Sequence, residues 1–425
     1  MSKTPPQFAD AFPRKRFFVE MFTRDIALED CILDLVDNSI DALIRSRKLN
    51  LESDIIADKR SRQLAQITVA ITPKRIAVTD NCGGIPKEKA LHEVFNFGHS
   101  LEGASDLTEH GLGAYGIGLK RALFKMGRSF RVDSVHNGDS FRVEQDLKQW
   151  LKRDDHLDQW RFPIVDVPSN KTDCPTNGTR IEVTDLYDNI KDLTKNDDFL
   201  DGVVRAISRS YSFFVSRYTT ITVNDVSIEP IHVPVGISPS YVPANDFYTD
   251  DGVSVRLRAG LAPRGPRGEW QMERAGWYVL CNGRLVVAAD KTSLTGWGAG
   301  ILPQFHSSKG RGFVGLALFT SDNPLKLPWT TTKRGLNRES PVYLRARNKM
   351  QSVARPVYSY LESLYPSDDA TGEEREAAKG VSQAPQKTLF KEQASQFKSR
   401  TRRIPAGMAT VQFTVLTGRL DPDQA

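Results

Sequence analysis

The sequence predicts an α+β fold, with helices packed on mostly antiparallel strands. Three features indicate this class: an amphipathic helical segment at 27–47, a strand hairpin at 64–80, and later strand-like segments that are not separated by regular helices. A doubly wound parallel sheet needs a repeated strand–helix–strand order, so the observed order favours a sandwich of helices on an antiparallel sheet.

The chain has 425 residues, and at about 150 residues per domain this length predicts two domains and a tail. Hydrophobic residues make up 39% of it, which is enough for a core and argues against wholesale disorder. No run approaches the roughly 20 apolar residues of a membrane helix and no secretory signal is visible, so we expect a cytoplasmic protein without a membrane partner. Four dispersed cysteines without a CxxC pair indicate neither a zinc site nor a disulfide framework.

The first expected domain covers residues 1–230. It opens with apolar residues at helical spacing, and the segments that follow alternate polar and apolar residues as half-buried strands do. The expected elements are a helix at 27–47, a hairpin at 64–80, glycine-rich loops over 81–118, a helix at 117–127, strands at 129–134, 140–145 and 179–184, a helix at 198–213 and a hairpin at 221–230 with Asn224-Asp225 at its turn.

The second expected domain covers residues 231–365. A two-residue turn at Asn282-Gly283 predicts a hairpin in its middle. Its expected elements are strands at 253–261, 276–288 and 312–321 and a helix at 339–364.

The expected tail, 366–425, begins acidic and becomes basic over 387–403, where six basic residues stand against one acid. These side chains could contact DNA phosphates, and a solvated flexible linker explains the same charges. The net charge of the whole chain, +6, permits nucleic-acid binding without establishing it. A lone strand expected at 411–420 would need a partner, such as a second protomer. The basic residues are Lys387, Lys391, Lys398, Arg400, Arg402 and Arg403.

The helix at 27–47 carries polar residues opposite its apolar stripe. Asp34, Asp37, Asn38 and Asp41 stand at positions i, i+3, i+4 and i+7, so they share one face over two turns. Three carboxylates this close repel one another, and Asp and Asn are poor helix formers. This cost suggests a bound cation or polar ligand, and an ordinary solvated acidic face is the alternative.

Two glycine-containing segments follow. VTDNCGGIP (78–86) places Asp80 at a strand end before a tight turn, where its carboxylate can accept a hydrogen bond from an exocyclic amine; an ordinary turn is the alternative. HGLGAYGIGLKRALFKMG (110–127) leads four glycines into a helix whose N-terminus presents N–H groups to an anion such as phosphate. It lacks both the βαβ context of a Rossmann fold and the GxxxxGK[ST] of a P-loop.

Together these motifs resemble those of the GHKL ATPase superfamily, which includes gyrase B, MutL, the heat-shock-type chaperones and MORC proteins. DLVDNSIDA (34–42), VTDNCGGIP (78–86), GAYGIGLK (113–120) and NGTRIEV (177–183) are similar to the four motifs of that superfamily and stand in the same order. The tyrosine and GLK of the third motif, with FGHS at 97–100, are most like the MORC branch. The resemblance implies a Bergerat-type ATP-binding α/β sandwich followed by a smaller α+β transducer-like domain.

The resemblance also implies an ATP site that uses Mg²⁺. Asn38 would hold Mg²⁺ between the phosphates, Asp80 would bind the adenine amine, and Thr179 would support it through water. Gly84 would let the base approach the backbone, and Lys120 would join a mobile lid, about 97–117, around the phosphates. The other positions implied at the nucleotide are Asp37, Asp41, Ile85, Gly113, Ala114, Tyr115, Gly116, Ile117, Gly118 and Leu119.

Two positions depart from the pattern of the superfamily. Its catalytic base is a glutamate four residues before the Mg²⁺ asparagine, and here that position is Asp34. The shorter side chain could fall about 1 Å short of the attacking water, and such a misplacement can cost roughly 100-fold in rate, so we expect slow hydrolysis. Cys82 replaces the first glycine of the adenine motif and needs a backbone conformation that a Cβ tolerates.

The second domain is similar in pattern to the transducer domain of gyrase B, MutL and MORC proteins, which sends one lysine to the γ-phosphate. LPWTTTKRGLN (327–337) makes Lys333 the candidate for this catalytic role beside Asp34, although a basic surface loop explains the same residues. Arg284, just after the expected hairpin turn, is a weaker candidate without an assigned role.

The resemblance implies an ATP-dependent homodimer that acts as a clamp on DNA or a protein client. A role in DNA handling or phage defence follows only by analogy. The N-terminal segment 5–18 would be the arm that the two protomers exchange. A non-hydrolysing ATP sensor that recruits a separate effector protein is the alternative, because Asp34 occupies the position of the base. A chaperone role is less favoured, since the tail is basic.

Overall fold

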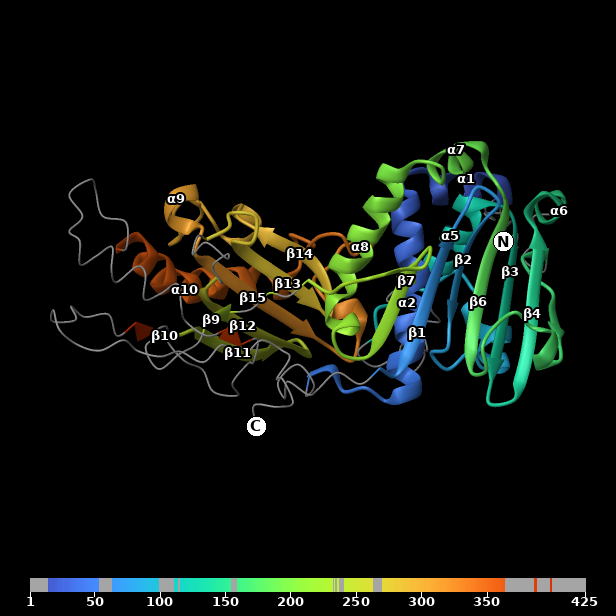
Figure 1. Ribbon diagram of the computed structural model, residues 1–425, viewed down its shortest axis with the longest axis horizontal. Coiled ribbons are helices and arrows are strands. Elements are labelled where there is room, and N and C mark those ends of the chain that lie inside the picture. Colours follow the sequence, from blue (N-terminus) through green and yellow to red (C-terminus); the bar gives the residue numbers. More distant parts are fainter. Residues whose placement is uncertain are drawn as a thin grey trace, which may run out of the picture.

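The described part of the computed structural model contains two large β-sheets, each covered by helices (Figure 1), and two short strand pairs. This mixed architecture confirms the predicted α+β class. The structure describes residues 14–52, 63–98, 111–113, 115–153, 159–231, 233, 235–236, 241–262, 270–363, 386–387 and 398–399.

The first sheet has eight strands and is mostly antiparallel. β1 and β7 form its parallel pair, and β2 lies between β1 and β6. In spatial order the strands are β5 (Ile164–Asp166), β4 (Asp139–Asp146), β3 (Gly127–His136), β6 (Gly178–Leu186), β2 (Arg75–Asp80), β1 (Ala65–Ile71), β7 (Thr219–Val223) and β8 (Val226–Ser227).

Helix α2 (Leu28–Arg47) is the central helix of the layer on this sheet. It packs against α5 (Gly118–Met126) and α8 (Asp197–Val215), and α1 (Lys15–Arg24) packs on α5. The apolar stripe of α2, including Ile32, Leu35 and Leu43, is fully buried. The shorter helical segments are α4 (Lys87–Lys89), the π-helix η1 (Ala90–Val94), α6 (Leu147–Lys152), η4 (Ser169–Lys171) and α7 (Asp188–Leu193).

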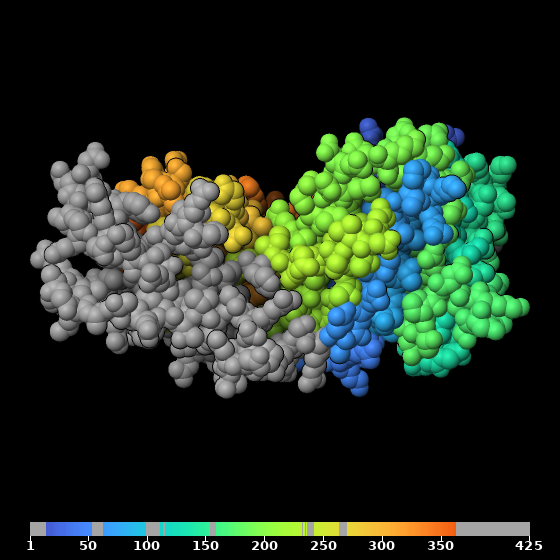
Figure 2. Space-filling model, in the orientation of Figure 1, coloured from blue at the N-terminus to red at the C-terminus, as the bar shows by residue number. Residues whose placement is uncertain are grey.

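The second sheet has five strands, with α10 (Pro341–Ser363) packed against β12 and β11. Helix α8 contacts both sheets, since it touches β14 as well as β7 (Figure 1). The residues just after α8, yellow-green in Figure 2, lie on the surface where the two parts meet. In spatial order the strands are β11 (Ala244–Asp250), β12 (Val253–Leu261), β15 (Phe313–Thr320), β13 (Gly276–Cys281) and β14 (Arg284–Asp290); short helices are η5 (Ser293–Thr295), α9 (Ser307–Gly310) and η6 (Pro324–Lys326).

Both predicted hairpin turns form. Asn224 and Asp225 have φ of 45° and 67°, and Asn282 and Gly283 have φ of 44° and 79°. Two consecutive residues with positive φ are what a tight hairpin turn of the I′ type requires, and Asn, Asp and Gly tolerate that conformation.

Several elements differ from the sequence-based expectation, among them α1, α6, α7 and β5, which were not predicted. Residues 87–94, expected in glycine-rich loops, are helical, because Lys87 to Val94 contains no glycine and buries Ala90 against the core. Strand β11 was not predicted, since its sequence ANDFYTD is too polar to show apolar alternation. The expected exchange arm 5–18 is described only from residue 14, and Lys15 already begins α1, which packs on α5 of its own chain.

Two short segments of the expected tail form strands that pair with earlier parts of the chain. β16 (Gln386–Lys387) pairs with β9 (Val235–Gly236), and β17 (Lys398–Ser399) pairs with β10 (Tyr241–Val242). The other four basic residues of the tail and the strand expected at 411–420 lie outside the described residues. Within the described part of the chain, no helix combines the length and apolar character that crossing a membrane requires.

Two glycine substitutions test the packing. A Cβ on Gly315, in β15, would overlap the ring of Trp277 on the neighbouring strand β13, so Gly315→Ala should lower the free energy of unfolding by about 1–3 kcal/mol. Gly202 lies inside α8, and a Cβ added there would meet nothing within 4 Å. Gly202→Ala should therefore raise the free energy of unfolding by about 0.5–1 kcal/mol. Urea unfolding followed by circular dichroism measures both; equal effects of the two variants would contradict the packing described.

Candidate functional site

The polar face of α2 is buried. The side chains of Asp34 and Asp37 are 4% and 1% exposed, and those of Asn38 and Asp41 are only partly exposed. This burial rules out the alternative of an ordinary solvated acidic face. A buried carboxylate needs hydrogen bonds or a counter-ion, so the partners of each one define the site.

The three carboxylates of this polar face have partners from different elements. Asp34 accepts a hydrogen bond from Arg121 Nη2 on α5 at 2.7 Å. Asp41 accepts hydrogen bonds from the backbone N–H groups of Leu112 and Gly113, the latter at 2.7 Å. The described residues contain no group of three His, Cys, Asp or Glu side chains placed to hold a metal ion. Protein cations and N–H groups therefore balance these carboxylates one by one.

Asp37 has the most partners. Its carboxylate accepts hydrogen bonds from Tyr211 on α8 at 2.6 Å, from Lys333 Nζ at 2.6 Å and from Arg284 at the start of β14. Burial favours a raised pKa for Asp37, but Arg284 and Lys333 outweigh it and the pKa is lowered. Asp37 was expected at the nucleotide, yet it does not line the cavity described next.

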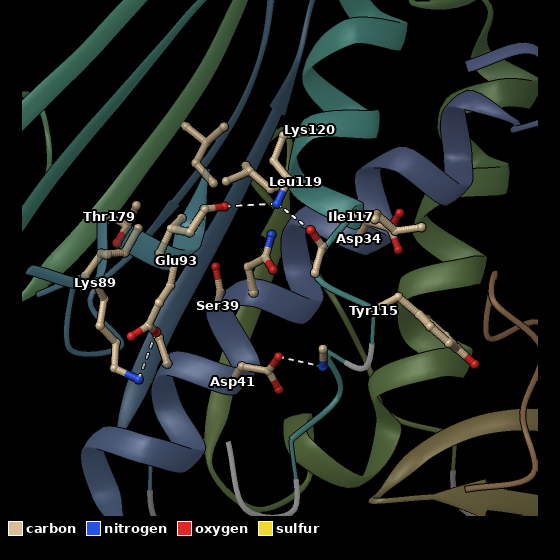
Figure 3. A pocket seen from close by; sticks show the side chains of 18 of the residues that line it. Asp34, Ser39, Asp41, Lys89, Glu93, Tyr115, Ile117, Leu119, Lys120 and Thr179 are labelled. Carbon is tan, nitrogen blue, oxygen red and sulfur yellow. Dashed lines mark hydrogen bonds and ion pairs between the residues drawn. The ribbon is translucent and has the colours of Figure 1, made fainter. Parts of the chain in front are cut away.

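A cavity lies beside α2 and is closed by β2, β6, η1 and the glycine-rich segment (Figure 3). The buried amide Nδ2 of Asn38 has no hydrogen-bond partner among the described residues. The predicted residues that line the cavity are Asp34, Asn38, Asp41, Asp80, Ile85, Gly113, Tyr115, Gly116, Ile117, Gly118, Leu119, Lys120, Thr179 and Lys333.

At one end of the cavity Asp80 stands at the end of β2, opposite Thr179 on β6. Its carboxylate accepts hydrogen bonds from the Ser39 hydroxyl at 2.7 Å and from the Cys82 N–H at 2.9 Å. Burial raises the pKa of Asp80, and these hydrogen bonds act against that rise. Each of the two carboxylate oxygens thus accepts a hydrogen bond from the protein, which fixes the orientation in which Asp80 can meet a ligand.

The turn after Asp80 accommodates the cysteine that replaces a glycine. Cys82 is fully buried and is not among the described residues with positive φ, so its Cβ causes no backbone strain there. Gly83 and Gly84 take the positive values, 123° and 70°. A Cβ on Gly84 would overlap the carbonyl oxygen of Val135, so Gly84 lets the turn pack on β3 and does not itself line the cavity.

At the other end, the glycine-rich segment is held against α2. Figure 3 shows Asp41 reaching the backbone N–H of Gly113. Gly118 begins α5 so close to Asp34 that a Cβ there would lie 3.1 Å from the Asp34 Cγ. Ala114, predicted at the nucleotide, lies outside the described residues. Upstream, the Asn282 side chain donates to the carbonyls of Gly111 and Ser321, both at 3.0 Å, which ties this segment to the second sheet.

Lys120 is buried in this segment without a carboxylate partner among the described residues. Its Nζ donates to the carbonyl oxygens of Val94 and Gly116 (Figure 3). Burial lowers the pKa of Lys120 to about 7. An ammonium group held only by carbonyls at the edge of a cavity is suited to bind an anion that enters it.

Three residues of the site were missed or undervalued by sequence reasoning: Ser39, Arg121 and Arg284. A signal for Arg121 exists, since Lys120 and Arg121 stand in the first turn of α5, where the helix dipole disfavours cations and a nearby anion is needed. No comparable signal marks Arg284, which is one charged residue followed by five apolar residues in the same strand.

Residues 26–170 match the family model of the histidine kinase-, DNA gyrase B-, and HSP90-like ATPase. This match supports the GHKL superfamily. It spans α2, the Asp80 strand and the glycine-rich segment, but neither Thr179 nor Lys333, and the MORC branch stays a prediction. No curated protein matches the chain.

The lowered pKa of Lys120 predicts a pH-dependent stability. Because about 7 lies below the ordinary value of 10.5, the unfolded chain binds more protons between these values, and the free energy of unfolding should rise with pH across that window. Lys120→Met removes this contribution, so the advantage of wild type over the variant should grow by at most about 1.4 kcal/mol per pH unit. Urea unfolding at pH 7 to 10 measures it, with the exposed Lys152→Met as control; parallel profiles for wild type and Lys120→Met would disprove it.

Proposed function

We propose that this protein binds ATP with Mg²⁺ in the cavity beside α2 and hydrolyses it slowly, as a nucleotide-gated homodimeric clamp. The observation that carries the proposal is the cavity itself, with Asp80 fixed at one end and Asp34, Asn38 and the glycine-rich start of α5 at the other. The GHKL match covers the same elements.

The residues of the cavity fit a magnesium nucleotide. Asn38 lines the cavity, and its amide oxygen would hold Mg²⁺, which when bound would offset charge on the phosphates. Its buried Nδ2, which has no partner among the described residues, can donate a hydrogen bond to a phosphate oxygen. Asp80 can accept from an adenine amine, and Thr179 stands opposite it on β6. The N–H groups at the start of α5 and the Lys120 ammonium would meet the phosphates.

The cavity measures about 200 Å³. Cofactor and ligand sites typically measure about 300–1,000 Å³, so we infer that the site widens when a nucleotide binds. The glycine-rich segment is the part suited to move, because a few hydrogen bonds such as those to Asp41 and Asn282 hold it.

Hydrolysis would depend on Asp34. Its carboxylate lines the cavity and would accept a proton from the attacking water, while Arg121 holds it in one orientation. Lys333 would supply positive charge to the terminal phosphate from the second sheet. Because aspartate is short and Arg121 competes for its oxygen, the rate should be low.

The ion pair between Asp34 and Arg121 favours a second candidate function, an ATP sensor without turnover that recruits a separate effector. If Arg121 never releases Asp34, no base reaches the water, and binding alone would change the conformation. For both candidate functions, the clamp and the sensor, the molecule acted on is a matter of proposal. The basic tail, including Lys387 and Lys398, supports DNA, and a MORC-like role in DNA handling or phage defence rests on resemblance alone.

Steady-state ATP hydrolysis with Mg²⁺ tests the enzyme proposal. Asp34→Asn should lower the rate by about 10²–10⁴-fold while nucleotide binding persists, because the base is lost but an amide oxygen can still accept the hydrogen bond from Arg121. Asn38→Ala should lose both hydrolysis and Mg²⁺-dependent binding. The exposed Asp188→Asn, at the start of α7, serves as the control and should keep the wild-type rate.

If the wild-type protein binds ATP but hydrolyses it no faster than Asp34→Asn does, the sensor proposal is supported and the ATPase proposal is wrong. Double-stranded DNA added to the same assay identifies the client class: stimulation supports DNA, and no stimulation at low salt favours a protein client.

Sedimentation velocity tests the homodimer. We expect a monomer with ADP and a dimer with Mg²⁺ and β,γ-imido-ATP, because an intact triphosphate would order the lid of both protomers. Asn38→Ala should stay monomeric under both conditions. A dimer of equal stability with and without nucleotide would contradict nucleotide gating.

A further inference from the structure

Two cations from the second sheet meet one buried carboxylate of the first part of the chain. Asp37 on α2 forms ion pairs with Arg284 on β14 and with Lys333 in the loop after η6. The side chains of Arg284 and Lys333 are almost fully buried, at 1% and 7% exposure. Asp37 therefore has two buried cationic partners, and one of them remains if the other leaves.

The two cations differ in how they are held. Arg284 lies on a strand of the sheet, its guanidinium is 5.4 Å from the ring of Tyr211, and it does not line the cavity. Lys333 lies in a loop, has a left-handed φ of 56°, and lines the cavity together with Thr331. Of the two, only Lys333 has both the flexible stem and the position to reach a ligand in the cavity.

The loop can stay in place while the Lys333 side chain moves. The next residue, Arg334, forms ion pairs with Glu29 and Asp30 in the first turn of α2. These pairs dock the loop on the same helix that carries Asp37, but at its N-terminal end. Moving the ammonium of Lys333 from Asp37 toward the cavity therefore needs side-chain rotation and no separation of the two sheets.

We propose that Arg284 is a positioning residue whose permanent ion pair with Asp37 lets Lys333 leave that carboxylate for the terminal phosphate of the nucleotide. The inference rests on the proposed function, because it takes the contact between Lys333 and the phosphate from there. Without Arg284, the departure of Lys333 would leave a buried carboxylate with no counter-ion, which is strongly unfavourable. Lys333 would then stay paired with Asp37 and would not contact the phosphate.

Equilibrium binding of ADP and of β,γ-imido-ATP to the full chain, with Mg²⁺, tests this inference. Wild type should prefer β,γ-imido-ATP by about 10-fold or more, as one charge-assisted contact to the terminal phosphate provides. Lys333→Met should abolish the preference. Arg284→Met should abolish it too, although Lys333 is still present.

The double variant Asp37→Asn with Arg284→Met provides the decisive comparison. It removes the carboxylate that would retain Lys333, so the preference for β,γ-imido-ATP should return. Arg284→Lys keeps a cation at this position and should retain at least part of the preference. Thermal unfolding of every variant, without nucleotide, shows which of them are folded, and a purely structural role of Arg284 would not give rescue by the second substitution.

An Arg284→Met variant that keeps the wild-type preference overturns the inference, as does a folded double variant that still lacks it. If the double variant does not fold, equal preferences in folded Arg284→Lys and Arg284→Met overturn it instead. A wild-type protein without any preference, or a Lys333→Met variant that keeps it, shows instead that the proposed contact between Lys333 and the phosphate is wrong, and the inference falls with it.

Discussion

A buried carboxylate needs a counter-ion, and in this protein that requirement determines how the second sheet packs on α2. Asp37 lies on α2, and its partners come from α8, β14 and the loop that carries Lys333. An uncompensated charge at this depth would be strongly destabilising, so the second sheet can dock on α2 in one way only: with its two cations at this carboxylate. The cavity wall that Lys333 and Thr331 supply follows from that docking.

The helix α2 shows how one amphipathic element serves both core and site. Its apolar stripe fixes its rotation on the first sheet, and that rotation aims the polar face at α5, the glycine-rich segment and the second sheet. Asp34, Asp37 and Asp41 then each find a different protein partner. Asn38 is left with a buried amide nitrogen that has no partner among the described residues, so it is a group of this face that still needs a hydrogen-bond acceptor.

Local sequence signals predicted the elements well, and the partners of the charged groups much less well. Apolar periodicity and turn chemistry identified α2, α8 and both hairpin turns, because these features depend on neighbouring residues. The same reasoning failed for the polar strand β11 and for the helical residues 87–94. The ion pairs of Asp34 and Asp37 join residues far apart in the chain, and no local pattern specifies which cation meets which carboxylate.

The contact between Asp37 and Lys333 joins residues 296 positions apart, and that between Asp37 and Arg284 joins residues 247 apart. Contacts of such sequence separation form late in folding, since the long intervening chain must first be ordered. A nascent chain that has reached only the end of the first sheet holds Asp37 without either cation. Synthesis must therefore reach Arg284 before Asp37 has a counter-ion, and Lys333 before the cavity wall is complete, which keeps shorter nascent chains from presenting a finished site.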